Sequence, residues 1–227
     1  MDIILDILRA LWQSDYETLA NPSLAWVIYI LLFVIIFLEN GLLPAAFLPG
    51  DSLLVLVGVL ISKDAMSFPV TLTVLTIAAS TGCWLGYVQG KFLGNTKIVQ
   101  GWLSHLPLHY HQRAYELFHR HGLHALLIGR FLAFIRTILP AIAGLSGLNN
   151  ARFQLFNWIS GALWVLILIS IGFFLGKTPL FLKHEDELMF ILILLPLVLL
   201  ISGLFGSLFI LWKKKRARAK NSDGAGR

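Results

Sequence analysis

Residues 123–148 read LHALLIGRFLAFIRTILPAIAGLSGL, and this stretch decides how the chain crosses a membrane. It is apolar enough to enter a bilayer, although it contains two arginines and a proline. Basic residues precede it in segment 91–122 and follow it at Arg152, which predicts that both of its ends face the cytoplasm. Two full crossings need about 40 residues, and the stretch has only 26. It is therefore predicted to form a re-entrant hairpin.

The composition of the whole chain agrees with a membrane protein. Of its 227 residues, 57% are hydrophobic and 13% are charged, whereas soluble domains carry about 25% charged residues. Lipid is then the only plausible solvent for much of the surface. The length suits a single membrane domain, residues 1–227. The one cysteine, Cys83, excludes an intramolecular disulfide.

Uncharged runs divide the chain into predicted segments. A membrane-crossing helix needs about 20 apolar residues, and three runs match that length without any charge. In chain order the segments are an N-terminal amphipathic interfacial helix (1–22), a first broken hairpin (24–62), a transmembrane helix (65–90), a cytoplasmic loop (91–122), the second re-entrant hairpin (123–148), a transmembrane helix (153–176), a C-terminal transmembrane helix (188–212) and a basic tail (213–227).

The distribution of basic residues predicts how these segments are oriented in the membrane. Six of the eight residues in segment 213–220 are basic, which places the C-terminus in the cytoplasm. Segment 177–187 and the pair Lys63–Asp64 then lie on the outer side. If the N-terminus also lies outside, segment 24–62 makes an even number of crossings, which allows either a hairpin or two short spans. The predicted fold is all-α and integral to the membrane, an inverted repeat of two re-entrant hairpins, each followed by a transmembrane helix. Transporters often use such repeats and bind their substrate where the repeats meet.

Four charged residues lie inside the apolar segments: Glu39, Asp51, Arg130 and Arg136. An ionised side chain at the bilayer centre costs roughly 2.5–3.5 kcal/mol even on a mild scale. The four charges must therefore pair, become neutral or face water. Because the acids lie in one hairpin and the arginines in the other, we expect them to meet around a polar cavity between the hairpins.

Structural roles compete with functional ones at these positions. Asp51 follows Pro49-Gly50 and could cap a helix that begins near Leu53. Glu39 ends an apolar helix, where a carboxylate is unfavourable to the helix dipole, so proton binding or ion pairing is favoured. Both arginines could only snorkel or neutralise the acids. Arg136 is nearer to the expected break at Pro140, and its guanidinium suits a phosphate, so it is the better anion-site candidate.

Two motifs resemble the signatures of the DedA (VTT-domain) family. The first joins FLENG at 37–41 to FLPGD at 47–51, and the second joins GRF at 129–131 to the residues that follow it. These are Arg136, Pro140, Ala143, Gly144 and Gly147. The resemblance runs from about Leu24 to Trp212 and is especially close to an enterobacterial branch.

This resemblance implies a bacterial inner-membrane protein with two facing hairpins. Family members are associated with moving lipid-linked phosphates, and this branch with proton motive force, alkaline tolerance and drug resistance. Carried over by position, the functional residues are the four charges named above.

Other classes of protein fit less well. The motif GLSG at 144–147 has the form of an intramembrane protease motif, but such an enzyme needs a histidine base inside the membrane. The histidines of the loop at 91–122 match no metal-ligand spacing and favour a lipid-facing segment. We expect no enzyme activity, no metal, no cofactor and no nucleic-acid partner. Glycines at 82, 86, 90 and 94 predict close helix packing.

The favoured function is proton-coupled translocation of a lipid-linked phosphate, such as undecaprenyl phosphate or a phospholipid. Glu39 and Asp51 would exchange protons while Arg136, helped by Arg130, binds the phosphate. The alternative is a proton-coupled antiporter for a cation or drug, in which the acids bind the solute. A third possibility is a non-transporting assembly or lipid-organising factor. The expected partners are membrane lipid and protons, with a homo-oligomer also open.

Overall fold

The computed structural model describes residues 10, 15, 18, 21–42, 50–93, 124–146, 148–185, 187–196, 198 and 201–202. Every element assigned in this part of the chain is a helix. In chain order these are α3 (Pro22–Gly41), α4 (Gly50–Ser62), α5 (Phe68–Leu93), α8 (His124–Gly129), α9 (Ala133–Leu145), α10 (Asn150–Gly176) and α11 (Pro179–Lys183). The all-α prediction is confirmed for these residues.

Three of the described helices are long and apolar enough to cross a membrane. They contain the spans Leu24–Gly41, Phe68–Phe92 and Asn150–Gly176. The second and third match the transmembrane helices predicted at 65–90 and 153–176. Their surfaces carry many exposed aliphatic and aromatic side chains, as expected of helices that face lipid.

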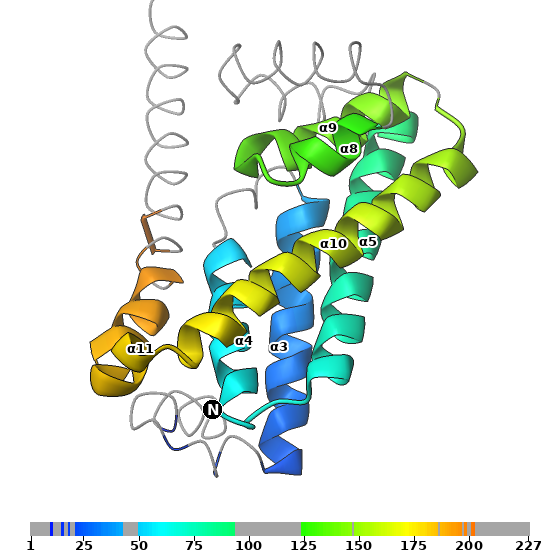
Figure 1. Ribbon diagram of the computed structural model, residues 1–227. Coiled ribbons are helices and arrows are strands. Elements are labelled where there is room, and N and C mark those ends of the chain that lie inside the picture. The colour runs from blue at the N-terminus through cyan, green and yellow to red at the C-terminus, as the bar shows by residue number, and fades with distance from the viewer. Residues whose placement is uncertain are drawn as a thin grey trace, which may run out of the picture.

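The first predicted hairpin consists of one long helix and one short helix. Helices α3, α4 and α5 run up, down and up through the bundle in Figure 1. At 1.5 Å per residue, the 13 residues of α4 extend about 20 Å, which is less than the roughly 30 Å hydrocarbon core. The 20 residues of α3 extend about 30 Å. Segment 24–62 thus contains one helix long enough to cross a membrane and one shorter apolar helix, and the choice between a hairpin and two spans stays a prediction.

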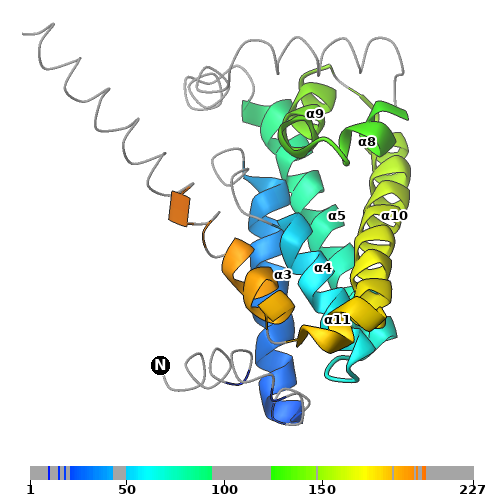
Figure 2. The same ribbon diagram turned by 60° about the vertical axis from the view of Figure 1, so that its left-hand side comes forward.

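The second predicted hairpin consists of two short helices, α8 with 6 residues and α9 with 13. They lie together at one end of the bundle, against α5 and α10 (Figures 1 and 2). The expectation of a helix break at Pro140 is wrong, because α9 continues through Pro140. The break lies after Gly129, a residue type that leaves a helix at little steric cost.

Contacts at the two ends of the bundle agree with the predicted relative sidedness. At one end, Lys63 after α4 forms an ion pair of 2.6 Å with Glu185 after α11. At the other end, the Tyr87 hydroxyl near the end of α5 donates to the Leu148 carbonyl before α10, at 2.5 Å. The turns predicted to share the outer side therefore do lie together, and so do those predicted to share the cytoplasmic side. Which end faces the cytoplasm stays a prediction.

Small residues allow the helices to pack closely around the site. A Cβ at Gly82 would press on the backbone of α3 near Phe37, and one at Gly90 would overlap the Ala141 carbonyl of α9. A Cβ at Gly172 would likewise overlap the Val55 carbonyl of α4. Close packing by the α5 glycines is confirmed for residues 82, 86 and 90, while residue 94 lies outside the described residues.

Several predictions fall on parts of the chain that the structure does not describe. These are most of the N-terminal segment 1–22, the loop beyond Leu93 with its five histidines, the tail 213–227 and most of segment 188–212. Within the last of these, Glu187–Pro196 is an apolar helix.

Candidate functional site

Three of the four predicted residues form one ion-paired cluster. Arg136, on α9, donates from Nη2 to Oε1 of Glu39 on α3. Its other terminal nitrogen, Nη1, donates to Oδ1 of Asp51 on α4, at 2.6 Å. One guanidinium thus holds two carboxylates that lie far from it in the sequence, on the facing hairpin. A planar fork of donors is the geometry that suits this task.

Glu39 is completely buried, and a helix N-terminus helps to offset its charge. Its carboxylate lies directly against Gly50, the first residue of α4, where a Cβ would overlap it. Glu39 therefore lies near the C-terminal end of α3, and its carboxylate also contacts the N-terminal end of α4. The N-terminus of a helix favours a negative charge. The sequence argument considered only the unfavourable dipole of α3 and missed this compensation.

Asp51 is in the first turn of α4 and its side chain is about half exposed, at 48%. It is not the cap of a helix that begins near Leu53, one of the two roles that the sequence left open, since α4 already begins at Gly50. Instead, Asp51 Oδ1 accepts both the Arg136 bond and a hydrogen bond of 3.1 Å from Nε1 of Trp164 on α10. An ion-pairing role is thus the one that the structure displays.

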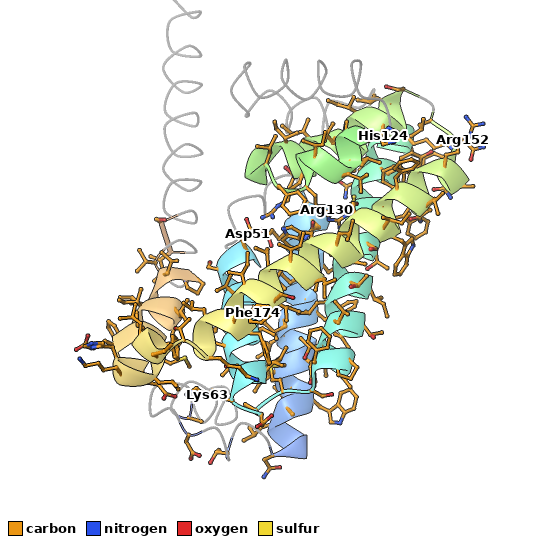
Figure 3. The ribbon with its side chains drawn as sticks, viewed as in Figure 1. Asp51, Lys63, His124, Arg130, Arg152 and Phe174 are labelled. Carbon is orange, nitrogen blue, oxygen red and sulfur yellow. The ribbon has the colours of Figure 1, made fainter. Side chains whose placement is uncertain are left out.

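The hydrogen-bond acceptors of Arg130 are uncharged groups. Arg130 lies in the turn between α8 and α9, below the short helix pair in Figure 3, where Asp51 is also labelled. Its Nη1 donates to the Ser160 hydroxyl at 2.9 Å and to the backbone and side-chain oxygens of Asn157 at 3.2 and 3.1 Å. Its Nη2 donates to the Ala79 carbonyl at 2.9 Å. Among the described residues Arg130 forms no ion pair, so of the two arginines only Arg136 is seen to pair with the acids.

Trp164 connects the two arginine environments. It is almost fully buried, and its indole ring lies 5.0 Å from the guanidinium carbon of Arg136 and 5.9 Å from that of Arg130. A cation over an aromatic face is stabilised, by about 2 kcal/mol when water is excluded. The ring can therefore support both positive charges where water is scarce.

A small cavity lies beside the two arginines. It is lined by Asn40, Cys83, Leu126, Arg130, Arg136 and Leu139. It has room for about one water molecule. The Nε atoms of both arginines are buried without a hydrogen-bond partner in the described part of the chain. A water molecule there is the ordinary way to satisfy such donors. The predicted polar chamber between the hairpins is thus narrow in this structure.

The four charges are balanced as a group. Glu39 and Asp51 contribute two negative charges, and Arg130 and Arg136 contribute two positive ones, so the sum is zero when all are ionised. Neutral clusters are the arrangement that a low-dielectric interior tolerates best. Adding a proton or an anion would disturb this balance, so either one could shift the equilibrium between two arrangements of the cluster.

Sequence reasoning missed the uncharged members of the site. It searched the apolar segments for charges, and Asn157, Ser160 and Trp164 carry none. Asn157 and Ser160 are nevertheless polar residues three apart in a span without charges, and both are fully buried. That spacing puts them on one helix face, which was the available signal. Trp164 gave no comparable signal, because tryptophan is ordinary in membrane helices.

Comparison with known proteins places this site in a family. The VTT domain model matches residues 48–174, which include Asp51, both arginines and Trp164 but not Glu39. The chain belongs to the VTT-domain, or DedA, family of membrane proteins. It is 70% identical to the Escherichia coli K12 inner membrane protein YqjA, over 95% of this chain and 98% of that protein. No solved structure gives a significant match.

More distant relatives agree with the same assignment. The Salmonella typhimurium inner membrane protein YghB is 57% identical over 96% of this chain and 100% of its own length. The E. coli protein DedA is 30% identical over 97% of this chain and 99% of its own length. The predicted resemblance to the family and its enterobacterial branch is confirmed. The relatives' names and the long apolar helices fit a multi-pass protein of the inner membrane.

Proposed function

We propose that this protein is a transporter that moves a lipid-linked phosphate, such as undecaprenyl phosphate or a phospholipid, across the bacterial inner membrane in a proton-coupled step. One observation supports this most: the Arg136 guanidinium is buried between two carboxylates from the facing hairpin. Those carboxylates occupy the positions that oxygens of a bound phosphate would take, because Arg binds both groups with the same fork of donors.

Proton uptake by a carboxylate would release Arg136 for a phosphate. When a carboxylate takes up a proton it loses its negative charge, and its attraction to Arg136 falls. A phosphate could then bind in its place. When the phosphate leaves, the carboxylate releases its proton and pairs with Arg136 again. Such exchange couples the protonation of Glu39 and Asp51 to the movement of an anion.

The position of the cluster suits a lipid better than a free solute. Helices α3 and α10 present apolar surfaces, with side chains such as Ile30, Leu163 and Phe174 exposed. A lipid could keep its hydrocarbon tail along these surfaces in the bilayer while only its headgroup enters the cluster. A narrow polar cavity is sufficient for that, since the tail never passes through it.

The alternative, a proton-coupled antiporter for a cation or drug, also has a specific observation in its favour. The cluster around Arg136 holds two carboxylates for one guanidinium, and Glu39 Oε2 is buried without a hydrogen-bond partner among the described residues. An excess acid of this kind could bind a proton or a cation.

Reconstitution into proteoliposomes separates these functions. We would measure movement of a fluorescent polyprenyl phosphate between leaflets, with and without a pH gradient, for the wild type, Arg136→Ala and Glu39→Gln. The proposal expects movement that depends on the gradient and is lost in Arg136→Ala. Proton flux driven by an added cation, without movement of the lipid, would instead support the antiporter, and neither activity would support a non-transporting role.

The matched control is Arg152→Ala, which removes an exposed arginine from the start of α10. It changes the net charge as Arg136→Ala does but leaves the cluster intact. Wild-type rates in this control would show that loss of a positive charge alone does not explain the defect. Size-exclusion profiles of each variant in detergent would show that it is folded.

A further inference from the structure

Two hydrogen-bond donors from different helices converge on a single oxygen at this site. Arg136 Nη1, from α9, lies 2.6 Å from Asp51 Oδ1. Trp164 Nε1, from α10, lies 3.1 Å from the same atom. Convergent N–H donors of this kind form a site for an anionic oxygen. In this structure the oxygen belongs to the protein itself.

We propose that these two donors form the headgroup subsite, that Asp51 is its resting occupant, and that a phosphate oxygen of the substrate replaces the Asp51 carboxylate there. Trp164 is then a substrate-binding residue in addition to Arg136. This inference rests on the proposed function and specifies which acid leaves and which groups receive the phosphate.

The two acids differ in their ability to leave. Glu39 has no exposed surface, and its carboxylate is confined against Gly50 at the start of α4. Asp51 has 48% of its side chain exposed, so it can turn away from Arg136 into space that is already open. A ligand that approaches from outside therefore meets Asp51 first. Glu39 remains as the fixed counter-ion of Arg136.

Trp164 cannot leave with Asp51. Its exposed fraction is 1%, and its ring is held under both guanidinium groups. A buried indole N–H that loses its acceptor is costly. When Asp51 turns away, Trp164 Nε1 and Arg136 Nη1 both need a new acceptor at the same point. A phosphate oxygen meets that need for both donors at once.

Charge balance favours an exchange of one proton for one anion. The four charges sum to zero when ionised. If Asp51 takes up a proton as a monoanionic phosphate binds, one negative charge is lost and one is gained, so the sum stays zero. A neutral headgroup, such as a sugar, would leave the cluster with an uncompensated positive charge.

The test measures binding to the purified, full-length protein in detergent. In Asp51→Asn the subsite loses its own carboxylate, so it should bind an added phosphate more tightly than the wild type does. The probe is dodecyl phosphate, titrated at constant ionic strength while the thermal unfolding temperature is followed. Dodecyl maltoside provides the same alkyl chain without the charge. Inorganic phosphate, tested separately, distinguishes free phosphate from a lipid headgroup as the ligand.

Trp164→Phe in the Asp51→Asn background is the decisive variant, because it keeps an aromatic ring but removes the donor. Loss of one hydrogen bond to a charged group should raise the dissociation constant for dodecyl phosphate about tenfold. Trp158→Phe, at an exposed position on the same helix, should leave it unchanged. An unchanged dissociation constant in folded Trp164→Phe, or weaker binding in Asp51→Asn than in the wild type, would overturn the inference.

A transport measurement separates this inference from the proposed function. If Arg136→Ala abolishes movement of the lipid phosphate but Trp164→Phe keeps the wild-type KM, the proposed function stands and the Trp164 subsite is wrong. If the wild type moves no lipid phosphate while the binding pattern above is observed, the anion subsite stands and transport is wrong.

Discussion

Arg130 and Arg136 lie six residues apart in the same hairpin, yet their surroundings differ in kind. Arg136 contacts two carboxylates, one of which is about half exposed. Among the described residues, Arg130 contacts uncharged groups of α5 and α10, including backbone carbonyls, a hydroxyl, an amide and the Cys83 thiol. The partners of Arg136 can change their charge by taking up a proton, whereas those of Arg130 cannot.

This difference assigns different roles to the two arginines. A guanidinium bound to carboxylates can exchange them for another anion, so the Arg136 pocket suits a reversible binding site. A guanidinium bound to carbonyls has no such exchange available, and it fixes the turn between α8 and α9 to the two long helices beside it. We therefore expect Arg136 to determine transport and Arg130 to determine the stability of the hairpin.

Replacement of Arg136 should have the largest effect on transport. Truncating one member of a buried, hydrogen-bonded charge pair costs about 2–5 kcal/mol of binding energy, which corresponds to at least about a thirtyfold loss of affinity for the phosphate in Arg136→Ala. The protein should still fold, because Glu39 can become neutral by binding a proton. Transport per folded molecule above a tenth of the wild-type rate would contradict the role of Arg136.

Replacement of Arg130 should have the largest effect on stability. Arg130→Ala removes charge-assisted hydrogen bonds and leaves the Ala79 carbonyl and the Asn157 side chain without this donor, so we expect a loss of about 3 kcal/mol. Denaturant unfolding in mixed micelles measures this loss, with exposed Arg152→Ala as the control. A stability equal to that of the control would show that Arg130 does not hold the hairpin.

The contact between Glu39 and Gly50 offers a smaller and more local test. A Cβ in Gly50→Ala would overlap the Glu39 carboxylate, and overpacking of this kind costs about 1–3 kcal/mol. Gly86→Ala is a suitable control, since its Cβ would lie 3.4 Å from the nearest atom outside its own helix. Equal unfolding free energies for the two variants would mean that α4 can shift away from Glu39.

The ion pair at the opposite end of the bundle should matter least. Lys63 and Glu185 are 2.6 Å apart, with side chains 16% and 26% exposed. Pairs near the surface contribute about 0.2–1 kcal/mol. Lys63→Met should therefore lower the unfolding free energy by less than about 1 kcal/mol and leave transport unchanged. A transport defect in this variant would show that this end of the bundle is coupled to the cluster.

Much of the fold follows from the sequence, and the reasons are physical. Length and the absence of charge were enough to predict α5 and α10 as spans, and the cost of charge in lipid was enough to select Glu39, Asp51, Arg130 and Arg136. The basic residues of the loops, together with the number of membrane crossings between them, also predicted which turns lie on the same side. These arguments use only segment length, the positions of charged residues and the distribution of basic residues along the sequence, all of which can be read without the structure.

The remaining features depend on tertiary contacts. Which acid pairs with which arginine depends on how α9 faces α3 and α4, and no local pattern fixes that geometry. The role of Trp164 became visible only through its contacts. The break between Gly129 and Ala133 was misplaced at Pro140, because a proline in a helix can be accommodated by its packing, here close to Gly86.

The most direct test of the comparison is the rate of lipid-phosphate translocation per folded molecule in Arg136→Lys and Arg130→Lys. Both variants keep the positive charge and lose the planar fork. We predict that Arg136→Lys falls to less than about a tenth of the wild-type rate, because an ammonium cannot hold both partners of the fork. Arg130→Lys, once corrected for the folded fraction, should stay within about threefold of the wild type. Equal losses in the two variants would contradict the separate roles assigned to these arginines.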